Sequence, residues 1–139
     1  MSLRTLTRDE WRLVVEAAVL TGFVYFGLRA LSFASLRRAL DACSRRTNRE
    51  SAAANVARIA WAVEAASRRI PGGRTCLIEA LTAEVMLRRR GYEPVLHLGI
   101  RKQTDPRQPV AGHAWVVCGD RIVIGTVADL TEYLIMPSA

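Results

Sequence analysis

The sequence contains few cysteines, the residues on which small domains stabilised by disulfides or by bound metals depend. It has three cysteines in 139 residues, at positions 43, 76 and 118, and no proline before residue 71. An odd number of cysteines at wide, unrelated spacings fits neither a disulfide framework nor a zinc motif, and is typical of a reducing compartment. We therefore expect a cytoplasmic protein that holds no metal and no cofactor.

Acidic residues are also scarce relative to basic ones. Thirteen Asp and Glu stand against 20 Lys and Arg, which gives a formal net charge of +7. No zinc-finger, helix-turn-helix or aromatic RNA-binding signature accompanies the basic residues, so we expect no binding to nucleic acid. Most of the arginines fall at expected helix ends, where cations complement the helix dipole. Solvated helix ends, or a docking face for an acidic partner, are the two interpretations that remain.

Apolar runs long enough to cross a membrane are missing as well. The most apolar segment is Ala17–Leu28, bounded by Glu16 and Arg29. A bilayer span needs about 20 apolar residues, so this segment predicts a buried helix and no membrane span. A peripheral contact with a membrane is the alternative. The segment has no small-residue cleavage site, and we expect no signal peptide.

The length and the apolar content predict one folded domain over residues 1–139. Half of the residues are apolar and a quarter are charged, which is typical of a globular chain of one domain. Residues 1–69 are expected to form a helical front half. Residues 70–139 are expected to form one more helix packed on a small antiparallel sheet, so the predicted fold class is α+β.

Three helices are expected in the front half. Thr7 and Glu10 form a capping-box pattern at the start of the first one, in which each side chain accepts a backbone N–H near the other residue. Residues 34–43 and the stretch that follows Asn48, its expected N-cap, also have apolar residues at helical spacing. The buried stripe expected for the first helix consists of Trp11, Val14, Val15, Ala18, Val19 and Gly22.

A break at Ile70–Gly73 separates the two halves of the chain. A fourth helix is expected to begin at Thr75 or Cys76 and to end before Gly91, because basic residues followed by glycine favour a helix stop. Beyond Gly91 the apolar period changes from helical spacing to two. The expected elements there are strands at 95–100, 111–118 and 121–127, a hairpin turn at 119–120 and a short helix at 130–134.

Cys76 and His113 are the residues whose settings suggest chemistry. The cysteine stands at a predicted helix start after Gly72 and Gly73, where the helix dipole favours a thiolate. His113 opens an apolar strand after a polar loop, with Trp115 on its own face, and is a better candidate for the base than His97. Cys43 and Cys118 have no such setting, and we interpret both as structural.

An ordered series of motifs resembles the leader peptidase of lasso peptide biosynthesis in its stand-alone short form, a family of the transglutaminase-like cysteine protease group. The matching segments are Cys76–Leu81, Leu87–Gly91, Leu98–Ile100 and His113–Val116. The resemblance implies that Cys76 attacks the scissile carbonyl of a precursor peptide and that His113 acts as acid and base. It further implies a separate leader-recognition protein as a partner, and possible cooperation with the lasso cyclase.

The motif series does not by itself identify the third catalytic residue. Relatives carry an aspartate about twelve residues after the histidine, where this chain has Gly125. Asp120 would lie at the hairpin tip, roughly 20 Å from His113 at ~3.3 Å per residue. Asp129 is the preferred candidate for orienting the imidazole, with Thr126 or a backbone carbonyl as alternatives.

Two other functions use the same residues differently. An acyltransferase or transglutaminase would transfer the acyl group to an amine instead of water, with the same cysteine and histidine. A non-catalytic helical adaptor would bind an acidic partner through its arginines and would keep Cys76 buried.

Overall fold

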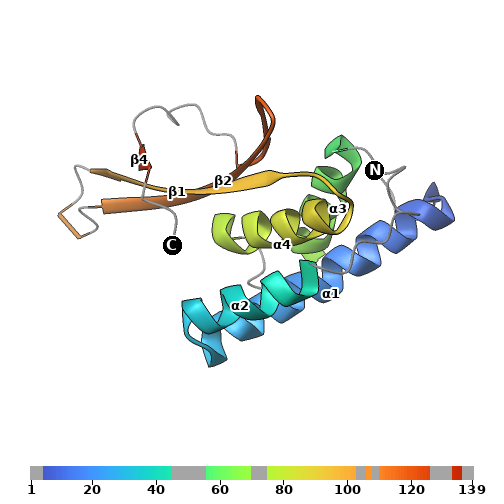
Figure 1. Cartoon of the computed structure of the whole chain (residues 1–139), viewed down its shortest axis with the longest axis horizontal. Coiled ribbons are helices and arrows are strands. Elements are labelled where there is room, and N and C mark those ends of the chain that lie inside the picture. Colours follow the sequence, from blue (N-terminus) through green and yellow to red (C-terminus); the bar gives the residue numbers. More distant parts are fainter. Residues whose placement is uncertain are drawn as a thin grey trace.

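In the described part of the chain the helices come first, up to Arg89, and a small antiparallel sheet follows them (Figure 1). The computed structural model describes residues 5–44, 56–69, 75–102, 106–107, 110–125 and 133–135. The helices are α1 (Arg8–Ala30), α2 (Phe33–Ser44), α3 (Val56–Arg69) and α4 (Cys76–Arg89), and the strands are β1 (Pro94–Lys102), β2 (Val110–Cys118), β3 (Arg121–Ile124) and β4 (Leu134–Ile135). This architecture confirms the predicted α+β fold.

The sheet has the strand order β3-β2-β1-β4, so β1 and β2 are its central strands. They pair antiparallel, with Leu98 opposite Ala114 and Gly99 opposite His113. A bulge interrupts the pairing of β2 with β3 between Val116 and Val117. Because side chains alternate along a strand, the register fixes which residues share a face of the sheet.

Helix α4 lies between the sheet and the helices α1 and α2 (Figure 1). It contacts β1, β2 and β3 on one side and α1 and α2 on the other, while α3 lies beside it and also contacts β3. Nine of its fourteen residues are buried, from Ile78 to Leu87. Alternate sheet residues complete the core on the side of α4, among them Ala114, Val116 and Ile124, with Leu96 and Leu98 partly buried beside them. The position of α4 therefore determines where Cys76, its first residue, is held.

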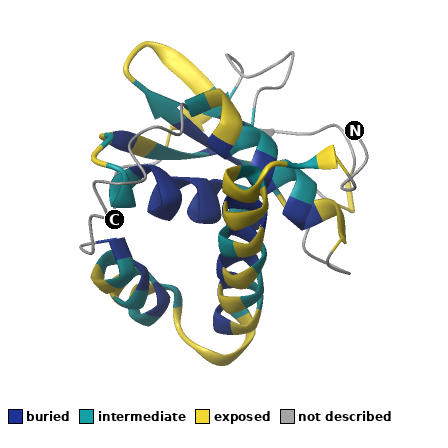
Figure 2. Ribbon diagram, turned by 90° about the vertical axis from the view of Figure 1, so that its right-hand side faces the viewer, coloured by how far each residue is buried: buried dark blue, intermediate teal, exposed yellow. Residues whose placement is uncertain are grey.

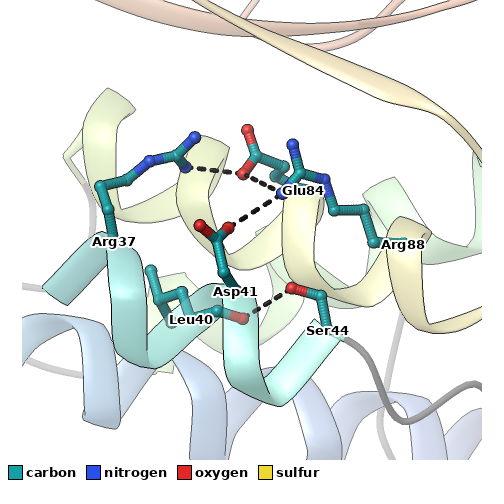
Figure 3. A network of polar contacts seen from close by, with 6 residues as sticks. All are labelled: Arg37, Leu40, Asp41, Ser44, Glu84 and Arg88. Atoms are coloured by element: carbon teal, nitrogen blue, oxygen red, sulfur yellow. Dashed lines mark hydrogen bonds and ion pairs between the residues drawn. The ribbon is translucent and has the colours of Figure 1, made fainter. Parts of the chain in front are cut away.

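Ion pairs join α4 to α2 and to α1. Figure 3 shows the first group, in which Arg37 Nη1 lies 2.6 Å from Glu84 Oε1 and Arg88 Nη1 lies 3.0 Å from Asp41 Oδ1. At the C-terminal end of the same helix, Nη2 of the C-cap Arg90 lies 2.5 Å from Glu16 Oε2 of α1. Glu84 is almost completely buried, at 2% exposure, so its charge depends on the two arginines that face it.

The first helix confirms one sequence prediction and corrects another. The Thr7 hydroxyl accepts the Glu10 N–H at 3.3 Å, and Glu10 accepts the Thr7 N–H at 3.0 Å, which is the predicted capping box. The predicted buried stripe is wrong in three places, because Trp11, Val15 and Val19 are exposed. The buried face of α1 consists of Leu13, Val14, Ala17, Leu20, Thr21, Val24 and Gly27. Because α1 is apolar on two faces, its periodicity allows either of them to face the core.

Two predictions for the C-terminal part change in the structure. The strand expected over 121–127 ends at Ile124, and Gly125 follows with a φ of 90°, which favours glycine. Leu134, which we expected at the end of a short helix, lies in the strand β4 paired with Ile100 of β1. The expected N-cap Asn48, and most of the segment 130–134, lie outside the described residues.

Candidate active site

Cys76 is the first residue of α4 and a free thiol of intermediate exposure. Thr75 precedes it as the N-cap, with an extended backbone, and its hydroxyl accepts the Ile78 N–H at 3.2 Å. The backbone N–H groups of the first helical turn have no acceptor within the helix. The positive end of the α4 dipole therefore lies at Cys76, and the Cys76 N–H can bind an oxyanion there.

The other two cysteines are set in different surroundings. Cys43 lies on α2 and packs against the hydrophobic core, and Cys118 is the last residue of β2. Both are free thiols of intermediate exposure. Neither begins a helix, so neither has the dipole that favours a thiolate.

His113 lies on β2 with its imidazole bonded to the end of β3. Its Nε2 is 2.5 Å from the carbonyl oxygen of Gly125. A carbonyl only accepts, so Nε2 carries the ring proton and Nδ1 has the free lone pair in the neutral ring. This is the tautomer that a general base at Nδ1 requires.

An aromatic cluster surrounds the imidazole of His113. The ring of Trp115 stacks at 5.8 Å between centroids, and that of Tyr133 lies at 5.5 Å. The ring of His97 also lies beside that of Trp115, at 5.5 Å between centroids. Trp115 and His97 are opposite each other across the two central strands. The prediction that Trp115 shares the face of His113 is therefore confirmed, and so is the prediction that His97 points away from Leu96 and Leu98.

The structure does not bring the thiol of Cys76 and the imidazole of His113 together. Helix α4 packs on the face of the sheet that carries Ala114 and Val116. By strand alternation His113 points to the opposite face, where it meets Trp115 and Tyr133. Both residues belong to the described part of the chain, and no hydrogen bond joins Cys76 to His113 there. The catalytic roles of these two residues stay predictions.

The candidates for orienting the imidazole of His113 lie in different parts of the structure, and two of them are not described. Asp129 and Thr126 lie outside the described residues. Asp120 is exposed in the turn between β2 and β3, as expected. The backbone carbonyl of Gly125 accepts a hydrogen bond from Nε2 of His113. A backbone carbonyl, one of the alternatives to an acidic residue, therefore contacts the imidazole.

Sequence reasoning did not identify the glycines that shape this face. A Cβ added at Gly99 would lie 2.8 Å from the Trp115 ring and 2.9 Å from Tyr133 Cβ, and one added at Gly125 would lie 2.6 Å from the Ala114 carbonyl oxygen. Only glycine permits such close approach. The available signal was a glycine, Gly99, opposite His113 in the expected strand pair. That signal can be read only when the register of the two strands is known. Within the described ranges, no group of three His, Cys, Asp or Glu residues is placed to hold a metal ion.

An α+β domain with a cysteine at the start of a helix that packs on an antiparallel sheet is the arrangement of a papain-like or transglutaminase-like protein. The family model for the transglutaminase-like superfamily matches residues 18–138. This chain therefore belongs to the transglutaminase-like superfamily, which generally contains cysteine proteases and acyltransferases. No curated protein and no solved structure matches the chain.

Proposed function

We propose that this chain is a cysteine peptidase that removes the leader from a lasso precursor peptide, with Cys76 as nucleophile and His113 as acid and base. The observation that carries the proposal is the cysteine at the first position of a capped helix, in a chain that belongs to this superfamily. The free Nδ1 that the Gly125 contact leaves on His113 supports the same assignment. The lasso substrate rests on the motif series over residues 76–116.

The proposed reaction is hydrolysis through a thioester. The Cys76 thiolate adds to the scissile carbonyl while the Cys76 N–H binds the oxyanion. The C–N bond breaks as His113 gives its proton to the departing amine, which becomes the new amino end of the core peptide. Water then attacks the thioester, His113 takes its proton, and the leader leaves with a new carboxylate while Cys76 is regenerated.

This reaction needs Nδ1 of His113 within about 3.2 Å of the Cys76 sulfur, or one water away. Since α4 and the imidazole lie on opposite faces of the sheet, β2 and the start of α4 must change their relative position when the precursor binds. Disulfide trapping measures this directly, because two cysteines bridge only when their Cα atoms lie within about 7 Å.

The trapping experiment uses a chain in which Cys43 and Cys118 are alanine. His113→Cys is expected to crosslink to Cys76 when the precursor peptide is present. Ala114→Cys, one residue along β2 and on the face of α4, is the matched control. If only Ala114→Cys crosslinks, with or without the precursor, the peptidase assignment to this pair is wrong.

Activity provides the second test of the assignment. Cys76→Ala is expected to lower leader cleavage at least about a thousandfold, and His113→Ala at least about a hundredfold. His97→Ala and Cys118→Ala are the controls, and should cleave at close to the wild-type rate. Mass spectrometry of the products separates hydrolysis from transfer, because hydrolysis adds the mass of water and transfer to an amine does not. Wild-type cleavage by Cys76→Ala would refute the proposal.

The proposed partners follow from the substrate. A separate recognition protein would hold the leader, and the lasso cyclase would use the freed amino end of the core. The proposed compartment is the cytoplasm, where precursor peptides are made and thiols stay reduced. Cleavage assays should therefore be run with and without the recognition protein.

One observation favours a second candidate, a non-catalytic adaptor. The imidazole of His113 and the helix that begins at Cys76 lie on opposite faces of the sheet. An adaptor needs no contact between them. A small thiol-reactive electrophile near neutral pH distinguishes the two functions, because an activated Cys76 labels before Cys43 and Cys118, whereas an unactivated one does not.

A further inference from the structure

One face of α1 is apolar and exposed to solvent along most of the helix. We call this the outer face of α1; it consists of Trp11, Val15, Val19, Phe23 and Phe26, with exposures between 43% and 68%. Figure 2 shows exposed positions running down one side of this long upright helix. The opposite side of α1 is buried against α3 and α4.

The spacing makes the outer face one continuous stripe. Its members follow each other at intervals of four, four, four and three residues, and residues at these intervals lie on the same side of a helix. From Trp11 to Phe26 the stripe is about 22 Å long at ~1.5 Å per residue. A contiguous apolar strip of this length on a folded domain marks an interaction surface.

The exposed charges along α1 are mainly basic. Between Trp11 and Ala30 the exposed charged residues are Arg12 and Arg29, at its two ends. Of the three carboxylates of α1, Glu10 belongs to the capping box, Glu16 is 21% exposed and engaged by Arg89 and Arg90, and Asp9 is exposed in the first turn beside Arg8. From Trp11 onward the face therefore presents aromatic and aliphatic side chains between two arginines, and the one exposed carboxylate of α1, Asp9, precedes it.

We propose that the outer face of α1 lies flat on a membrane surface that contains anionic lipids. In this position the aromatic and aliphatic side chains enter the boundary between headgroups and acyl chains, while Arg12 and Arg29 pair with lipid phosphates. The net charge of +7 attracts the chain to the same surface. This proposal is independent of the proposed peptidase function.

The charge pattern argues against a second copy of the chain as the occupant. In an antiparallel pair of α1 helices, Arg12 of one copy would lie near Arg29 of the other. In a parallel pair each arginine would meet its own counterpart. The one exposed carboxylate of α1, Asp9, precedes the stripe beside Arg8, so either arrangement brings together more like charges than opposite ones, which opposes association.

The packing of α1 argues against a transmembrane helix. By length and composition α1 is apolar enough to cross a bilayer, but 39% of its most apolar stretch is buried inside the fold. A span would have to withdraw Leu13, Ala17 and Val24 from the core and carry the Glu16 ion pairs into hydrocarbon. Contact in the plane of the interface leaves the fold unchanged.

Flotation with vesicles tests the proposal on the full chain. The wild-type protein is expected to float with vesicles of phosphatidylcholine containing 30% phosphatidylglycerol and to remain in solution with pure phosphatidylcholine. High salt should weaken the binding. Brominated lipids are expected to quench Trp11, and Trp11→Phe should remove this quenching while Trp61 and Trp115 remain.

The variant Val19→Glu/Phe26→Glu adds two carboxylates to the outer face and should weaken partition into these vesicles at least about tenfold. Both side chains are exposed, so circular dichroism and thermal melting should match the wild type. The matched control is Val95→Glu/Leu134→Glu, which places the same charges on exposed apolar positions of the sheet and should bind like the wild type.

Three results would overturn the proposal. The first is absence of wild-type flotation with anionic vesicles, and the second is equal flotation of wild type and Val19→Glu/Phe26→Glu. The third is a wild-type dimer in sedimentation analysis that this variant abolishes without any vesicle binding. That result would assign the outer face to a second copy.

Discussion

Replacement of Arg37 by methionine is expected to destabilise the fold by leaving the Glu84 carboxylate without its nearest cation. The carboxylate is buried, at 2% exposure, and Arg37 Nη1 lies 2.6 Å from its Oε1. The second cation, Arg88, is 3.6 Å from the same oxygen and also pairs with Asp41 (Figure 3). Among the described residues, Oε2 of Glu84 has no hydrogen-bond partner.

The expected loss follows from the burial of the pair. Removing one partner of a fully buried ion pair costs about 3–5 kcal/mol, whereas breaking an exposed pair costs about 0.2–1 kcal/mol. Arg37 is 22% exposed and Arg88 remains in place, so we expect Arg37→Met to lower the free energy of unfolding by about 2–3 kcal/mol. With a urea m-value of roughly 2 kcal/mol per molar, the midpoint should fall by about 1 M.

Urea unfolding followed by far-UV circular dichroism measures this loss. Arg38→Met is the matched control, because Arg38 is the exposed neighbour on α2; it should change the stability by less than about 0.5 kcal/mol. The double variant Arg37→Met/Glu84→Met removes both charges and should recover most of the loss. A loss below about 0.5 kcal/mol for Arg37→Met would refute the reasoning that Glu84 is charged and depends on Arg37.

Two further predictions concern backbone positions. Gly125→Ala forces a Cβ within 2.6 Å of the Ala114 carbonyl at a φ of 90° and should cost at least about 1 kcal/mol, while Gly119→Ala, at a φ of 65° in open space, should cost less by urea unfolding. Equal losses would contradict the role assigned to the close contact. Thr7→Ala removes the hydroxyl that caps α1 and should cost about 1 kcal/mol. Thr7→Ser, which keeps the hydroxyl, is the matched control. A loss of stability for serine as large as that for alanine would contradict the capping box.

The local structure of this chain could be predicted where a short-range rule decides it. The capping box at Thr7 and Glu10, and the helix start at Cys76, depend on groups within four residues of each other. The alternation that puts Trp115 with His113 depends only on the geometry of one strand. Each of these features was therefore predictable from neighbouring residues.

The buried face of α1 could not be predicted in the same way. Trp11, Val15 and Val19 have the spacing of a core stripe, and so do Leu13, Ala17 and Leu20. Packing against α3 and α4 decides between the two, and it buries the second set. The first set is left exposed because a 23-residue helix offers more apolar surface than these neighbours cover.

The sequence by itself determined most of the secondary structure, the α+β class, and the presence of a cysteine at the first position of a helix and of a histidine on a strand, because these depend on local spacing. The tertiary structure decided that Glu84 is buried beside Arg37, that Gly125 holds the imidazole of His113, and that His113 lies on the face opposite α4. These relations join residues 12 to 47 positions apart. They depend on strand register and helix packing, which local spacing does not fix.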